Sequence, residues 1–320
     1  MAKKSKRGSG PRPGSNRAER VAARKARQAA DLAAPARPFQ GLAAECDLVA
    51  MRAFIASATA QVTFADGVDT ANEADFATIL PGAVPGLARS RDAAKWGERG
   101  AATGVDGSVT QALVALQTDP EPADLGGALA SSLAWAVDAE PGSEFRDRDD
   151  APALADVLDV DAPIEVVVYQ DFTWWFGDDA SVSPQIAAML DRANETILPT
   201  TRLHNASGVG APWWVDAGDR AHLRWVRPED EFALMDALAR LHADSRLTLG
   251  EGSRFAGSFR THGLVVPVFD LDNEMHAEEW LGAVDQLDEW LNEALADTSD
   301  LTAAQRGSRA GIIGRQVTLR

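Results

Sequence analysis

The stretch LVVPVFDLDNEMHAEEWLGAVDQLDEWLNEAL, residues 264–295, carries the clearest structural pattern in this chain. Its opening, Leu264–Phe269, is a valine-rich apolar run that predicts a strand. Because proline has no N–H to donate, Pro267 places that strand at a sheet edge or at a bulge. The remainder has helical spacing and predicts a long amphipathic helix. The apolar stripe of this helix consists of Trp280, Val284, Leu287, Leu291 and Leu295.

An earlier stretch, Val109–Val137, has the same order of elements. Val109–Gln117 predicts a strand, an acidic turn begins at Asp119, and a helix follows with an apolar residue at every fourth position from Leu125. The shared order is consistent with a diverged duplication, although the sequence identity between the two stretches is slight. Strands in hairpins followed by helices predict an α+β fold of two antiparallel-sheet-plus-helix halves.

Shorter patterns complete the expected organisation. The charged, proline-bearing segment Glu144–Asp161 is the predicted boundary between an N-terminal half, residues 39–150, and a C-terminal half, residues 151–320. Helices are expected over Glu45–Ile55, Pro184–Ile197, Glu229–Leu241 and from Thr302, and strands over Thr59–Phe64, Phe76–Leu80, Ile164–Tyr169, Trp213–Val215 and His222–Val226.

The basic residues are concentrated at the start of the chain. Residues 1–28 contain ten Lys and Arg and one acid, so their formal charge is 10 − 1 = +9. Residues 29–320 carry 21 − 47 = −26. Glycines and prolines in residues 1–38 predict a disordered tail, with a nascent helix over Ala18–Ala34. The basic residues of this electrostatic arm are Lys3, Lys4, Lys6, Arg7, Arg12, Arg17, Arg20, Arg24, Lys25 and Arg27.

Composition limits the compartment and the partners. The chain has one cysteine, Cys46, which cannot form an internal disulfide and has the apolar neighbours of a buried residue. No apolar run has the length of a membrane span, and we expect a cytoplasmic protein without membrane contact. The acidic body, with Lys95 as its one lysine, argues against a nucleic-acid surface there.

The glycine-rich segment Gly250–Ser258 fails as a phosphate loop. Gly252 and Gly257 have the spacing of a P-loop, but Ser258 and Phe259 stand where its lysine and hydroxyl residue are needed. We therefore expect a flexible turn before the Leu264 strand.

Three cation-capable residues near these glycines form a candidate ligand site. Arg254, Arg260 and His262 could bind a phosphate or a carboxylate, since arginine offers a bidentate fork to such groups. The alternative is that the arginines form ordinary surface ion pairs with nearby acids.

Other chemistries lack support. No pair of the five histidines has the spacing of a zinc site, and we expect no metal and no cofactor. The acids of Asp270–Glu274 are interpreted as helix-capping groups.

At least one tryptophan in each of the pairs Trp174-Trp175 and Trp213-Trp214 is expected in the core, because neighbouring strand residues face opposite ways.

Several phrases spread over the chain resemble one actinobacterial family, a domain of unknown function that covers the body after the tail. They are RPFQGL (37–42), TILP (78–81), WVRPE (225–229), RTHGL (260–264) with the strand to Asp270, and RQVTLR (315–320). The family has no established activity, so it implies no catalytic residues. Its members are sometimes labelled preprotein translocase or topoisomerase. Both labels conflict with this sequence, which lacks a Walker lysine and has a single tyrosine, Tyr169, within an acidic body.

The sequence therefore favours a non-enzymatic adaptor. We expect the basic arm to contact an anionic partner, nucleic acid or the ribosome, while the body binds a protein. The alternative is an enzyme or sensor that holds a small anionic metabolite at Arg254, Arg260 and His262. A third possibility is that the arm folds back on the acidic body.

Overall fold

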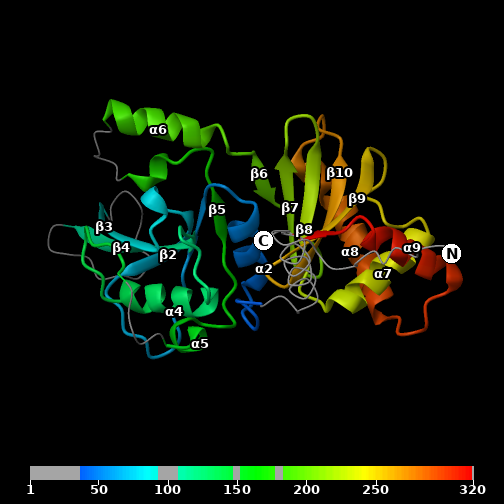
Figure 1. The fold of residues 1–320 in the computed structure, drawn as a ribbon, viewed down its shortest axis with the longest axis horizontal. Helices are drawn as coiled ribbons and strands as arrows, with labels where there is room; N and C mark the ends of the chain where they lie inside the picture. The colour runs from blue at the N-terminus through cyan, green and yellow to red at the C-terminus, as the bar shows by residue number, and fades with distance from the viewer. Residues whose placement is uncertain (1–36, 93–106, 147–151, 177–182, 319–320) are drawn as a thin grey trace, which may run out of the picture. The chain divides into compact units, whose positions relative to one another are not determined.

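The computed structural model describes residues 37–92, 107–146, 152–176 and 183–318. They form a mixed α+β fold with two sheets and flanking helices, which confirms the expected fold class (Figure 1). The tail expected to be disordered lies outside the described residues except for Arg37 and Pro38. Phe39, where we expected the body to begin, is fully buried.

The first sheet has five strands in the order β3-β4-β2-β1-β5. Neighbours are antiparallel except β2 and β4, which run parallel. The strands are β1 (Ala58–Gln61), β2 (Glu73–Ile79), β3 (Gly86–Asp92), β4 (Ser108–Gln117) and β5 (Val166–Val168), and the associated helices are η1 (Pro81–Ala83), α4 (Leu125–Ala136), α5 (Leu154–Val157), η2 (Thr173–Trp175) and α6 (Pro184–Asn194).

Both faces of this sheet are covered, because alternate residues of β4 point to opposite sides. Val114 packs into the core that includes Leu133 of α4, whereas Leu113 packs against Trp174 and Trp175 of η2. Figure 1 shows α4 and α6 on opposite sides of the sheet.

The second sheet has six strands in the order β11-β9-β10-β8-β7-β6. Helices α7 and α8 pack together, and α9 packs on α7. The strands are β6 (Thr200–Arg202), β7 (Ala211–Asp216), β8 (Ala221–Val226), β9 (Ser253–Thr261), β10 (Leu264–Leu271) and β11 (Val317–Thr318), and the helices are α7 (Glu231–Ala243), η3 (Ala277–Trp280), α8 (Leu281–Ala296) and α9 (Ala303–Ile313).

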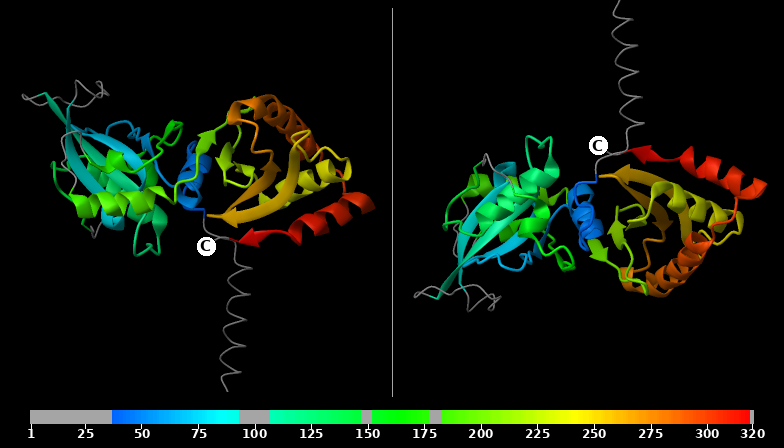
Figure 2. Two further views of the ribbon diagram at one scale, coloured as in Figure 1. Left: turned by 90° about the horizontal axis from the view of Figure 1, so that it is seen from above. Right: turned by 90° about the horizontal axis from the view of Figure 1, so that it is seen from below.

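Helix α2 (Glu45–Ala53) lies between the two sheets and contacts β2 and β4 of the first and β7 and β8 of the second (Figure 2). Trp213 of β7 joins the core around α2, while its neighbour Trp214 joins the core beneath α7 and α8. All four residues of the two tryptophan pairs are buried, so the expectation of at least one core residue in each pair is confirmed.

Three details differ from the sequence expectation. The segment expected as a flexible turn contains most of β9, and the turn itself is confined to residues near Gly250 and Gly252, both of which have a positive φ. Strand β10 is an interior strand, so Pro267 is not at an edge; the other expected place, a bulge, is confirmed, because the register of β10 against β9 shifts between Val268 and Phe269, next to the proline. The strand expected to open the C-terminal half is β5, which pairs with β1 of the first sheet.

The proposed duplication and the boundary near residue 150 stay predictions. Four neighbouring strands of each sheet have the same spatial order when they are ranked by position in the chain. They are β3-β4-β2-β1 in the first sheet and β9-β10-β8-β7 in the second. The two sheets differ in that β4 runs parallel to β2, whereas β10 runs antiparallel to β8. None of the helices in the described ranges combines the length and the apolar character that crossing a membrane requires.

Candidate functional site

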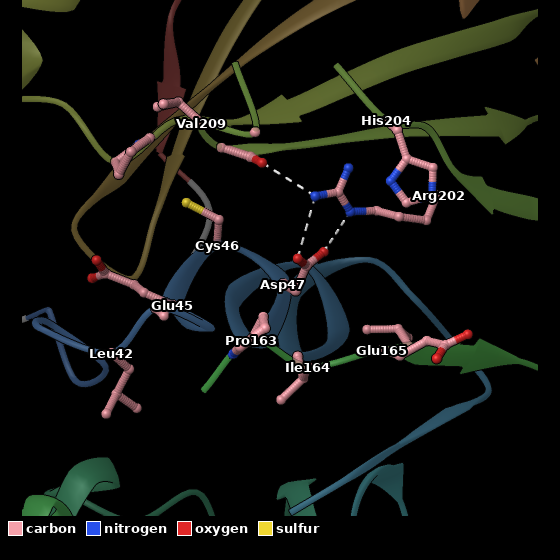
Figure 3. A pocket seen from close by; sticks show the side chains of 15 residues that line it. Leu42, Glu45, Cys46, Asp47, Pro163, Ile164, Glu165, Arg202, His204 and Val209 are labelled. Atoms are coloured by element: carbon pink, nitrogen blue, oxygen red, sulfur yellow. Dashed lines mark hydrogen bonds and ion pairs between the residues drawn. The ribbon is translucent and has the colours of Figure 1, made fainter. Parts of the chain in front are cut away.

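A cavity of about 670 Å³ lies beside the first turn of α2 (Figure 3). Four parts of the chain line it: the start of α2 with the residues before it, the segment 163–166, the end of β6 with the loop that leads to β7, and Pro228. The polar and charged side chains in the lining are Glu45, Cys46, Asp47, Glu165, Arg202 and His204.

Arg202 joins two walls of this cavity. Its Nε donates to Asp47 Oδ1 at 2.7 Å and its Nη2 donates to Asp47 Oδ2 at 3.3 Å, as Figure 3 shows. The same Nη2 also donates to the carbonyl of Gly210 at 3.1 Å. Because the guanidinium is already engaged by a carboxylate and by carbonyl groups, it is poorly placed to hold a second anion.

A buried charge cluster supports the β6–β7 loop. The Arg227 side chain is 0% exposed, forms an ion pair with Glu229 and donates to the carbonyl of Val209 at 3.0 Å. Asp288 of α8 lies 3.5 Å from Arg227 Nη1 and accepts a hydrogen bond from the backbone N–H of Ser207 at 2.9 Å. The loop is therefore held by Arg227, which directly follows β8, and by Asp288 of α8.

The acidic and thiol groups of the cavity are restrained as well. Burial, and next the charge of Glu45, raises the pKa of the Cys46 thiol to about 12, so it is a protonated thiol at neutral pH. Glu45 is buried and accepts from Arg37 Nε at 3.0 Å. Within the ranges that the structure describes, no group of three or more His, Cys, Asp and Glu side chains is arranged to hold a metal ion.

The structure does not bring Arg254, Arg260 and His262 together. Arg254 and Arg260 lie six residues apart on β9, roughly 20 Å at the usual rise of a strand. Arg254 forms an ion pair with Asp270, and Arg260 Nε donates to Glu231 Oε1 at 2.7 Å. Both arginines thus make the ion pairs that the sequence left open as the alternative.

His262 occupies the tight turn between β9 and β10. Its φ of 47° and that of Gly263, 77°, are both left-handed, as in a two-residue hairpin turn. Burial, and next the positive charge of Arg52, lowers the pKa of His262 to about 4, so the imidazole is neutral at neutral pH.

The ten basic residues of the electrostatic arm lie outside the described residues. The cavity beside α2 was not found from the sequence, because Asp47 and Arg202 are 155 residues apart and no local spacing connects them. Cys46 is the exception, since its burial was expected from its neighbours and is confirmed.

Comparisons with known proteins were made over the whole chain. A family model described as "Family of unknown function (DUF5926)" matches residues 38–320. No curated protein and no solved structure matches the chain.

Proposed function

Because the chain belongs to this family of unknown function, to which no activity is assigned, we propose from its charges and contacts that it is a non-enzymatic interaction protein whose arm, residues 1–28, binds an anionic partner, nucleic acid or the ribosome. The observation that carries the proposal is the separation of charge, +9 in residues 1–28 against −26 in the remainder. Binding to phosphates needs clustered Lys and Arg, and the arm supplies ten of them in 28 residues.

The pairing of cations in the body supports this assignment. Arg202, Arg227 and Arg260 each contact a carboxylate, so their charge is compensated locally. His262 is neutral at neutral pH because its pKa is lowered to about 4. An anion that approaches these body residues therefore meets mostly repulsive or compensated charge, whereas the arm carries a formal charge of +9.

The state of two potential nucleophiles supports a binding role over a catalytic one. The Cys46 thiol is buried and its pKa is raised to about 12, which leaves very little thiolate at neutral pH. The hydroxyl of Tyr169 shares a hydrogen bond with Thr59 Oγ1 at 3.1 Å, and its ring stacks on Trp174. Both groups have structural roles.

The test compares two triple variants of the full chain that lose the same charge. One changes Lys3, Lys4 and Lys6 to Gln; the matched control changes the exposed body residues Arg146, Arg192 and Arg254 to Gln. We expect the wild type to bind single-stranded RNA weakly, with a Kd on the order of 10⁻⁴–10⁻⁶ M that rises with salt.

The arm variant should weaken RNA binding severalfold and reduce its salt dependence, while the control variant binds as the wild type does. Cosedimentation with ribosomes separates the ribosome from free RNA as the partner. Equal binding by the wild type and the arm variant, or equal weakening in both variants, would remove the arm from the function.

A further inference from the structure

A second cavity, of about 450 Å³, lies between α4 and the end of β4, away from the cavity beside α2. Its volume falls within the range of small-molecule pockets, which are mainly apolar with a few placed polar groups. The walls here have that character. The apolar residues that line it include Leu116 of β4, Leu129 of α4 and Phe145.

One buried hydroxyl group in this cavity has no partner. Ser131 of α4 is 4% exposed and lines the cavity, and its Oγ makes no hydrogen bond within the described part of the chain. Its neighbour Ser132 differs, since its Oγ donates to the carbonyl of Ala128 at 3.0 Å. Because almost none of this Oγ is accessible from the cavity, a ligand there would not reach it, and the polar contacts open to a ligand are those at the rim.

The charges at the rim of the cavity determine whether a cationic or an anionic ligand is favoured. Asp119, Glu121 and Asp124 line the rim, and no Lys, Arg or His is among the described residues of the lining. Arg52, from outside the lining, forms an ion pair with Glu121, which leaves a formal charge of −3 + 1 = −2. The start of α4 contributes about half a positive charge, which is too small to reverse that sign.

We propose that this cavity binds a small organic cation, an apolar group that carries an ammonium. The apolar group packs between Leu116, Leu129 and Phe145, and the ammonium lies at the rim beside Asp119. The site is independent of the arm and of the partner proposed above.

In the experiment, the full-length chain is titrated at low salt with three probes of similar size, and binding is monitored by ligand-observed NMR. The probes are phenethylamine, the neutral 2-phenylethanol and the anionic phenylacetate. We expect the amine to bind with a Kd on the order of 1 mM, which is appropriate to a ligand of so few atoms. The alcohol should bind severalfold more weakly, and phenylacetate should not bind measurably, because the rim carboxylates repel it.

One substitution at the rim locates the site, and a second is its control. Asp119→Asn changes an exposed rim residue and should weaken binding of the amine about threefold to tenfold without affecting the alcohol. The matched control, Asp219→Asn, changes an exposed acid in the turn between β7 and β8 and should bind all probes as the wild type does.

Four results would overturn the proposal: no binding of the amine, equal binding of amine and alcohol, tighter binding of phenylacetate, or the same amine affinity in Asp119→Asn and Asp219→Asn. Both aspartates are exposed and outside the core, so neither substitution should prevent folding.

Discussion

Arg227 provides the sharpest test of the interactions that hold the second sheet to its helices. Its side chain is 0% exposed and lies between Glu229 and Asp288, and the Asp288 side chain is 1% exposed. Replacing Arg227 by Met retains much of the apolar stem but leaves two carboxylates without their counter-charge. Removing one partner of a buried ion pair costs about 3–5 kcal/mol. For a chain of this size that loss corresponds to a decrease in Tm of roughly 6–15 °C.

The Tm and the free energy of unfolding are measured by thermal and urea unfolding, with tryptophan fluorescence as the readout. Arg220→Met is the control, because Arg220 also pairs with an acid, Asp270 at 3.3 Å, but its side chain is 56% exposed. An exposed pair contributes only about 0–1 kcal/mol.

A double variant directly tests the energetic coupling between Arg227 and Asp288. Adding Asp288→Asn to Arg227→Met removes one of the uncompensated carboxylates, so the double variant should lose less stability than the sum of the two single losses, by more than about 1 kcal/mol. If Arg227→Met destabilises no more than Arg220→Met, or if the two losses simply add, the buried cluster does not stabilise the fold as described.

Two further predictions concern titratable groups whose pKa is shifted. The pKa of His262 is lowered from 6.5 to about 4, so the unfolded chain binds more protons between these values and stability falls as the pH is lowered from 6.5 to 4. His262→Asn, which tolerates the left-handed turn, should reduce that loss in urea unfolding measured at both ends of the window, and an unchanged pH dependence would contradict the assignment. The pKa of Cys46 is raised to about 12, so a thiol reagent at about pH 8 should leave the folded chain unlabelled and label it fully in urea; rapid labelling of the folded chain would show that the thiol is accessible.

Local sequence patterns were sufficient to predict an element wherever its apolar residues repeat with a helical or strand period within a short segment. The stripe from Trp280 predicted α8, and the helix expected from Thr302 is α9, where Thr302 and Gln305 make both reciprocal hydrogen bonds of a capping box. Strand β9 was missed because its sequence, Ser253–Thr261, contains glycine and serine and lacks an apolar alternation. Its extended conformation depends on pairing with β10 along nearly its whole length.

The candidate sites were harder to predict than the elements. Arg254 and Arg260 are close in sequence, but an extended strand separates residues by about 3.3 Å each, and their side chains are engaged by Asp270 and Glu231. The cavity beside α2 depends instead on Asp47 and Arg202, which no spacing rule connects.

The amino-acid sequence alone determined the uneven charge of this chain, the α+β class and most of the helices, since charge is additive and helical periodicity is local. Only the tertiary structure decided the strand order, the burial of Arg227 and Asp288, and the two cavities. The physical reason is that cavities and buried ion pairs form where distant segments pack together: Arg227 and Asp288 are 61 positions apart, and Asp47 and Arg202 are 155 positions apart.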